Sequence, residues 1–209
     1  MAVLRYLSHP QVTVDPDVPV PRWSLSPEGR RRVEIMAEEQ PWVATLGRVV
    51  SSGETKARQT ARLLARRLGP DVEVEVRPET GEIDRSATGF VSPGEHEELA
   101  DALFAQPEVS ARGWERAVDA QARMVAALAD LLDPATPADI AVVGHGGVGT
   151  LWWCHLAGLA IDRRHDQPGQ GHHWALDLTT GRPIHPWRPI DRIDLAGQPS
   201  RPGGPGRSG

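Results

Sequence analysis

Asp139-Ile140-Ala141-Val142-Val143 is a hydrophobic run that leads directly into Gly144-His145-Gly146-Gly147. A run of this kind, without alternating polar residues, is typical of a central strand that is buried on both faces. The segment from Gly146 to Gly158 follows at once and favours a helix. Groups at the carboxyl ends of strands in open α/β sheets face one crevice, where ligands bind. We therefore expect His145 to lie beside a ligand.

A second histidine also follows a strand-like run. Val3–Ser8 leads to His9, and Val49–Ser52 leads into a predicted helix over Glu54–Leu68 that carries Lys56. Two imidazoles and a lysine at one sheet edge would suit phosphoryl chemistry. One imidazole can attack phosphorus, and the cations can hold the phosphate oxygens.

The other segments continue an alternation of strands and helices. Ser26-Pro27 predicts a helix to about Glu39, because a hydroxyl caps the helix and proline fits its first position. Val72–Val76 alternates apolar and charged residues, which predicts a half-exposed edge strand. A capping box from Ser92 to Glu95 predicts the start of another helix.

The C-terminal half is expected to hold a long amphipathic helix and a terminal hairpin. The helix is predicted over Trp114–Leu132, and its core face is expected to comprise Ala117, Val118, Val125, Leu128 and Leu132. The hairpin is predicted from residues 173–178 and 182–184. Together these elements predict a three-layer α/β/α sandwich with a mainly parallel sheet.

Composition limits the classes of protein that fit this chain. A length of 209 residues allows one domain, which we predict over residues 1–195. Residues 196–209 are rich in Gly, Pro, Ser and Arg and are expected to be a disordered tail. The net charge of −5 argues against a general nucleic-acid binder. No long uncharged apolar run is present to predict a membrane span, and the single Cys154 fits a reducing cytoplasm.

Five motifs in a fixed order resemble the histidine phosphatase superfamily, which has the phosphoglycerate mutase-like fold. Ser8-His9-Pro10 stands where that family has Arg-His-Gly, and Leu25–Arg30 matches its Leu-Thr-Pro-x-Gly-Arg stretch. Ser51–Ala61 matches its Ser-Ser-x-x-x-Arg-Ala-x-Gln-Thr-Ala element, Glu82 stands at its conserved acid, and His145-Gly146-Gly147 ends the series. The order of the motifs makes the resemblance specific.

The resemblance implies a metal-independent phosphomonoester hydrolase that needs no cofactor. It implies that His9 is the nucleophile that forms a phosphohistidine and that His145 stabilises the transition state. Glu82 is the implied general acid, with Asp84 as the alternative, and Lys56 would bind phosphate. The implied substrate is a small phosphorylated molecule or a phosphoprotein.

Two cations of the family pattern are changed in this chain. Ser8 stands in place of the arginine before the nucleophile, and Lys56 replaces the second pocket arginine. Arginine grips phosphate with a rigid fork, whereas lysine offers a point charge. Arg85 is the first candidate to supply the missing cation at the pocket, and Arg22 is the second.

Other functions stay open at the level of sequence. With two arginines lost, the chain could be an inactive relative that binds a phosphorylated ligand, and a phosphomutase would use the same intermediate. Gly144–Gly149 also fits the Gly-x-Gly-x-x-Gly fingerprint of dinucleotide-binding proteins. That fingerprint also requires a following strand and an acidic residue about 20 positions later, and the acidic residues at that distance do not follow a hydrophobic strand end. A metal site is not expected, because the late histidines lack carboxylate or cysteine partners at ligand spacing; they are His165, His172, His173 and His185.

Overall fold

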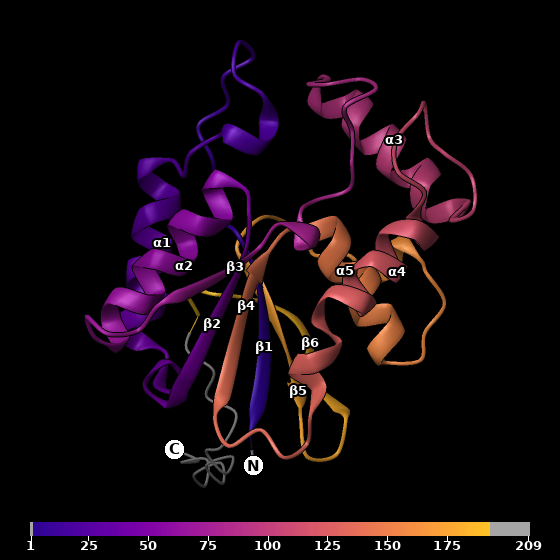
Figure 1. Cartoon of the computed structure of the whole chain (residues 1–209). Coiled ribbons are helices and arrows are strands. Elements are labelled where there is room, and N and C mark those ends of the chain that lie inside the picture. Colours follow the sequence, from indigo (N-terminus) through magenta and orange to yellow (C-terminus); the bar gives the residue numbers. More distant parts are fainter. Residues whose placement is uncertain (1, 193–209) are drawn as a thin grey trace, which may run out of the picture.

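A six-stranded mixed sheet forms the centre of the computed structural model, which describes residues 2–192 (Figure 1). The strand order is β3-β2-β4-β1-β5-β6. The parallel pairs are β3–β2, β2–β4 and β4–β1, while β5 runs antiparallel to both β1 and β6. The strands are β1 Val3–Ser8, β2 Leu46–Ser52, β3 Val74–Arg77, β4 Asp139–Gly144, β5 His172–Asp177 and β6 Arg182–Pro189.

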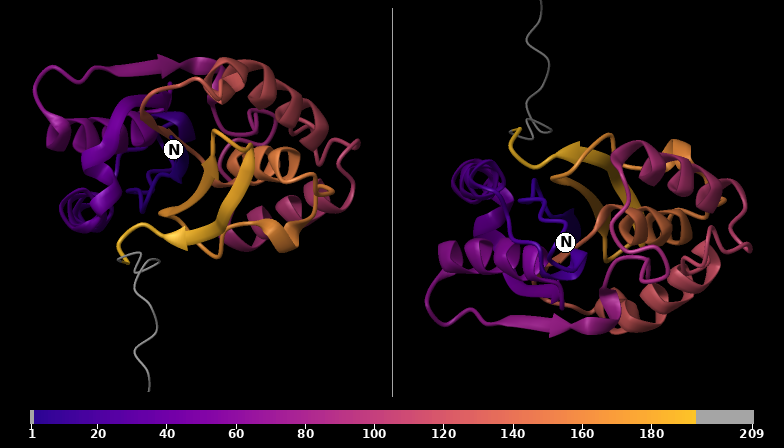
Figure 2. Two further views of the ribbon diagram at one scale, coloured as in Figure 1. Left: turned by 90° about the horizontal axis from the view of Figure 1, so that it is seen from below. Right: turned by 90° about the horizontal axis from the view of Figure 1, so that it is seen from above.

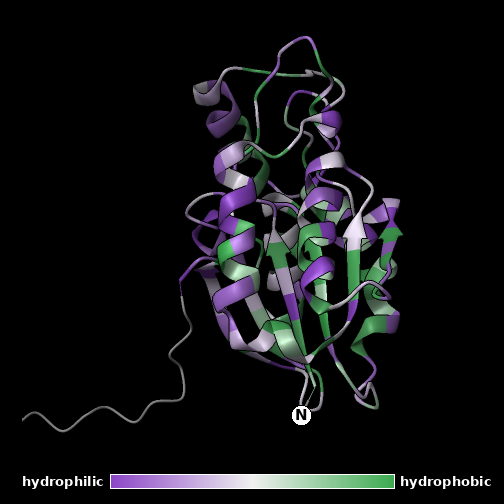
Figure 3. Ribbon diagram, turned by 90° about the vertical axis from the view of Figure 1, so that its left-hand side faces the viewer, coloured by the Kyte–Doolittle hydropathy of each residue, from purple (hydrophilic) through white to green (hydrophobic). Residues whose placement is uncertain are grey.

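Helices cover both faces of this sheet, as the views along the strands show (Figure 2). On one face lie α1 (Pro27–Glu39) and α2 (Thr55–Leu68); on the other lie α4 (Ala117–Leu128) and α5 (Gly146–Leu156), with α3 (Pro93–Ala105) beyond the strand ends (Figure 1). The strands in the middle are hydrophobic along much of their length, whereas the helices carry many hydrophilic residues (Figure 3). The predicted three-layer α/β/α fold with a mainly parallel sheet is confirmed.

Strand β4 has the central position that its sequence predicted. Ile140 and Val142 join the core beneath α4 and α5, while Ala141 and Val143 join the core beneath α1 and α2. Successive side chains of a strand point to opposite faces, so one short run supplies both cores. The boundary of the predicted disordered tail, 196–209, lies outside the described residues.

The helix predicted over Trp114–Leu132 was wrong at both ends. Arg112 and Gly113 have positive φ angles of 51° and 85°, and helix α4 begins only at Ala117. Its last turn passes into a 3₁₀ segment, Ala129–Leu132. The predicted core face was also partly wrong, because Val118, Val125 and Leu132 are half-buried. The buried stripe instead follows helical spacing through Ala117, Ala120, Met124, Leu128 and Leu131.

The other predicted starts and turns agree with the structure within a few residues. Ser26 Oγ accepts a hydrogen bond from the Gly29 amide at 3.1 Å, and Ser92 Oγ accepts one from the Glu95 amide at 3.3 Å. The edge strand β3 and the β5–β6 hairpin are present. Among the described residues, no helix combines the length and apolarity that a membrane span requires.

Candidate active site

The register of two neighbouring strands brings the two histidines together. Ser8 of β1 pairs with Gly144 of β4, so the residues that follow both strands emerge side by side. The His9 amide donates to the Gly144 carbonyl oxygen at 3.1 Å. The ring centroids of His9 and His145 lie 5.4 Å apart, with an angle of 70° between the ring planes. The two rings therefore lie side by side at the carboxyl ends of β1 and β4.

The ring of His9 has one nitrogen fixed by the backbone. Its Nδ1 lies 2.8 Å from the Pro10 carbonyl oxygen, which can only accept a hydrogen bond. We therefore assign the proton to Nδ1, which leaves Nε2 with a lone pair. Burial is the main reason that the pKa of His9 falls to about 3, and His145 and Lys56 lower it further. The ring is thus neutral near pH 7, as a nucleophile must be.

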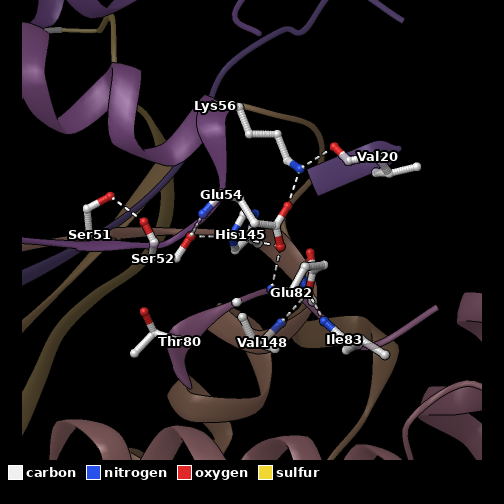
Figure 4. Close-up of polar contacts among 12 residues, drawn as sticks. Val20, Ser51, Ser52, Glu54, Lys56, Thr80, Glu82, Ile83, His145 and Val148 are labelled. Carbon is white, nitrogen blue, oxygen red and sulfur yellow. Dashed lines mark hydrogen bonds and ion pairs between the residues drawn. The ribbon is translucent and has the colours of Figure 1, made fainter. Parts of the chain in front are cut away.

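His145 is held at both its backbone and its ring. The Tyr6 hydroxyl accepts from the His145 amide at 2.8 Å and donates to the His145 carbonyl oxygen at 2.9 Å. Ring Nε2 lies 2.7 Å from Ser52 Oγ and 3.5 Å from Glu54 Oε1 (Figure 4). Ring Nδ1 is buried and has no hydrogen-bond partner among the described residues. Burial lowers the pKa of His145, so this ring is also held toward its neutral form.

Glu82 closes the N-terminus of helix α5. Its Oε2 accepts from the Gly147 amide at 3.3 Å, and its Oε1 accepts from the Val148 amide at 3.1 Å and from the Ile83 amide at 3.0 Å (Figure 4). Burial alone would raise the pKa of Glu82, but His145, Arg85 and the Ile83 amide lower it overall. The carboxylate is therefore ionised in this state, in contrast to the raised pKa that suits a general acid.

Glu54 is a further residue of this site that the sequence did not single out. Its Oε2 forms an ion pair with Lys56, and its Oε1 accepts from the Glu82 amide at 2.9 Å (Figure 4). Lys56 Nζ also donates to the Val20 carbonyl oxygen at 3.0 Å. Burial would raise the pKa of Glu54, but its interactions with His145, Lys56 and the Glu82 amide outweigh burial and lower the pKa to about 2. The signal available in the sequence was the place of Glu54 at the start of the helix that carries Lys56.

Ser8 is the last residue of strand β1, and its hydroxyl is hydrogen-bonded within the protein. Ser8 Oγ is within 2.5 Å of Gln167 Oε1 and accepts from the His172 amide at 3.0 Å. The residue is 1% exposed. Its hydroxyl therefore ties β1 to the segment that leads into β5.

The other predicted site residues differ in whether they line the cavity next to His9. Arg85 lines the cavity described below, and its guanidinium lies 5.4 Å from the centre of the Trp114 ring. Arg22 and Asp84 are exposed and are not among the residues that line this cavity. The Asp84 carboxylate accepts from the Ser86 amide at 2.8 Å. Of the two arginine candidates, only Arg85 is therefore placed to face a ligand.

A cavity of about 670 Å³ extends from His9 toward the space between residues 10–23 and helix α3. Both segments lie beyond the carboxyl ends of the parallel strands (Figure 1). Lys56, Glu82 and Arg85 contribute polar groups to its wall. Much of the remaining wall is apolar and includes Val12, Val20, Trp23, Ile83, Phe90, Val91, Leu103, Phe104 and Trp114.

The structure gives no support to a dinucleotide site or to a metal site. The strand after α5 is β5, which runs antiparallel to β1, so Gly144–Gly149 is not followed by the parallel strand of a βαβ unit. Glu82 also accepts from two of the amides that would face a pyrophosphate. Among residues 2–192, no three His, Cys, Asp or Glu side chains are grouped to hold a metal ion.

Comparison with known proteins gives the family of the chain. The sequence model of the histidine phosphatase superfamily (branch 1) matches residues 13–182. The chain belongs to this superfamily. The matched range begins after Ser8-His9-Pro10, so it does not include these three residues. No sequence among the curated proteins matches the chain.

Solved structures of low sequence identity share the superfamily fold. YhfR of Bacillus stearothermophilus has a TM-score of 0.72 at 18% identity, covering 89% of this chain and 95% of its own. A mycobacterial glucosyl-3-phosphoglycerate phosphatase has a TM-score of 0.67 at 20% identity, covering 90% and 96%. The phosphoserine phosphatase of Entamoeba histolytica has a TM-score of 0.70 at 17% identity, covering 88% and 94%. At these identities the likeness shows the phosphoglycerate mutase-like fold.

Proposed function

We propose that the protein is a phosphomonoester hydrolase that works through a phosphohistidine on His9. The observation that carries this proposal is the neutral His9 ring, whose Nδ1 is fixed by Pro10 and which faces His145 at one end of a cavity. Membership of the histidine phosphatase superfamily supports the same chemistry.

The proposed reaction has two steps. The lone pair of His9 Nε2 attacks phosphorus while the bond to the leaving oxygen breaks, which gives phosphohistidine and an alcohol. Water then gives a proton to the Glu82 carboxylate and attacks phosphorus, the P–N bond breaks, and inorganic phosphate and free His9 are released. His145 Nδ1 lacks a protein partner and would donate to a phosphate oxygen in the tautomer that carries its proton there. Lys56 would supply positive charge.

Glu82 is the proposed proton donor to the leaving oxygen. It lines the cavity and is ionised in the ligand-free site, so it must gain a proton when substrate binds. A phosphate dianion beside a carboxylate raises the pKa of that carboxylate, because like charges disfavour ionisation. The substrate would therefore bring Glu82 to the protonation state that the first step needs.

The wall of the cavity favours a leaving group with an apolar or aromatic part. Trp23 and Phe90 meet edge-on, with ring centroids 5.5 Å apart, and Phe90 is 43% exposed. Trp114 forms part of the same wall. Burial of apolar substrate surface here would stabilise the complex by roughly 25 cal/mol for each Å² removed from water.

Binding of a phosphorylated ligand without turnover is the second candidate function. The specific observation in its favour is that the Lys56 ammonium is already paired with Glu54, while Ser8 offers no cation. A site with so little uncompensated positive charge would stabilise a transition state poorly.

Hydrolysis of para-nitrophenyl phosphate in the presence of EDTA tests the proposal. Wild type, His9→Ala and His155→Ala should be compared, because His155 is an exposed histidine of α5 outside the cavity. We expect turnover in wild type and in His155→Ala, and none in His9→Ala. A radiolabelled phosphodonor should label wild type but not His9→Ala. Absence of both turnover and labelling in wild type, across about pH 5 to 8, would refute the hydrolase and favour the binding protein.

A further inference from the structure

A carboxylate lies among the groups that are expected to hold the substrate phosphate. Glu54 Oε1 is 3.5 Å from Nε2 of His145, and Glu54 Oε2 is paired with Nζ of Lys56. The side chains of Lys56 and Glu54 are 4% and 13% exposed, and that of His145 is fully buried. Water therefore screens this group of charges only weakly.

The position of Glu54 is fixed on several sides. Its Oε1 also accepts from the Glu82 amide at 2.9 Å, and its own amide lies 3.4 Å from Ser52 Oγ. The pKa of Glu54, lowered to about 2, keeps the carboxylate ionised at any ordinary pH. Glu54 is thus a largely buried negative charge that is held in place by defined partners.

Lys56, Glu54, Glu82 and the two histidines together carry no excess of positive charge without a ligand. Lys56 contributes one positive charge, which Glu54 neutralises. Burial lowers the pKa of both His9 and His145, so neither ring adds a full charge near pH 7. Glu82 adds a further negative charge, which the amides at the start of α5 compensate in part.

We propose that Glu54 determines the phosphate affinity of this site by competing with the substrate phosphoryl group for Lys56. Phosphate can gain the Lys56 ammonium only when Glu54 Oε2 gives it up, and Glu54 then remains close to the bound dianion. Like charges placed together in a buried site oppose binding. The inference rests on the proposed function in one respect, that the phosphoryl group enters between His9, His145 and Lys56.

Glu54→Gln is the variant that tests this role. The single amide oxygen of glutamine can accept either from Lys56 or from the Glu82 amide, so the change removes the charge and keeps one of the two contacts. Isothermal titration calorimetry with inorganic phosphate should show binding that is at least about tenfold tighter in Glu54→Gln than in wild type. Glu73→Gln removes the same charge at an exposed residue near β3 and should bind phosphate as wild type does.

Two further variants distinguish the proposed effect from a folding defect and from a general effect of the protein's net charge. Glu54→Ala removes the carboxylate without an amide, and it should also bind phosphate more tightly. Adding Lys56→Met to Glu54→Gln should abolish the gain, because the freed ammonium is its source. Phosphate affinity that is unchanged or weaker in both Glu54 variants would overturn the inference, as would an equal gain in Glu73→Gln.

The outcomes separate this inference from the proposed function. Tighter phosphate binding in Glu54→Gln, with no hydrolysis by wild type or variant, would retain the role of Glu54 and reject the hydrolase. Hydrolysis by wild type that depends on His9, with no gain of affinity in either Glu54 variant, would retain the hydrolase and reject the role of Glu54.

Discussion

Removal of one hydroxyl should show how His145 is kept in place. Tyr6 is fully buried, and burial raises the pKa of its phenol, so the hydroxyl stays protonated and able to donate. In Tyr6→Phe the His145 amide loses its hydrogen bond to the Tyr6 oxygen. The His145 carbonyl oxygen also loses one bond, but it still accepts from the Gly149 amide at 3.1 Å. Tyr6→Phe therefore leaves one buried donor, the His145 amide, without its hydrogen-bond partner.

The loss of stability in Tyr6→Phe follows from the unpaired His145 amide. A buried polar group without a partner lowers the free energy of unfolding by about 1–3 kcal/mol. For a domain of this size, that corresponds to a fall in Tm of roughly 2–12 °C. The backbone of His145 should also shift, and a displacement of about 1 Å at a catalytic group can cost up to about 100-fold in rate.

Urea unfolding and hydrolysis of para-nitrophenyl phosphate measure the two effects. Thr60→Val is the matched control, since Thr60 is fully buried in α2 and its hydroxyl donates only to the Lys56 carbonyl oxygen four residues before it. That change should alter stability by less than about 1 kcal/mol, because it leaves no buried amide unpaired. If Tyr6→Phe unfolded at the same urea concentration as wild type and kept full activity, the argument that the hydroxyl positions His145 would be refuted.

Two further predictions concern pH and substrate. The pKa of His9 in the folded protein is about 3, below its usual value of about 6.5. Between these two pH values the unfolded chain binds more protons than the folded protein. The free energy of unfolding should therefore fall as the pH drops from about 6.5 toward 3, by up to about 1.4 kcal/mol per pH unit. His9→Gln should therefore lose less stability than wild type between about pH 6 and 4 in urea titrations; an equal loss would show that His9 does not stay neutral. Phe90→Ala should raise KM for 1-naphthyl phosphate several-fold while leaving KM for glycerol phosphate unchanged, because Phe90 offers only apolar contact. Equal effects on both substrates would argue against an apolar leaving-group site.

The fold could be predicted from sequence because its signals are local. The run from Asp139 to Gly144 is buried on both faces and can only be a central strand, and Ser26-Pro27 carries a helix start within two residues. The boundary of α4 could not be predicted in this way. It depends on the positive φ angles at Arg112 and Gly113 and on packing that selects Ala120 and Met124 over the branched valines.

The site was predictable only in part, because motif order names residues and not their partners. The meeting of His9 and His145 follows from adjacent parallel strands, which the α/β pattern implies. The contacts of Glu54 depend on residues that are distant in sequence, namely Glu82 and His145. The presence of a glutamate at the start of a helix does not reveal that its side chain contacts two other ionisable residues.

The charge balance of the site makes Arg85 a candidate to complete a phosphate site. Ser8 supplies no cation, and Lys56 is shared with Glu54, so a bound dianion needs positive charge from elsewhere. Arg85 already lines the cavity, and its guanidinium stacks over the buried Trp114, a contact worth about 0.5–2 kcal/mol. A charge-assisted hydrogen bond to phosphate is worth about 1.5–3 kcal/mol, and arginine can form two of them with one phosphate, so substrate can outweigh the contact with the ring. The missing arginine of the nucleophile motif can thus be replaced from the cavity wall, provided that the side chain turns toward His9.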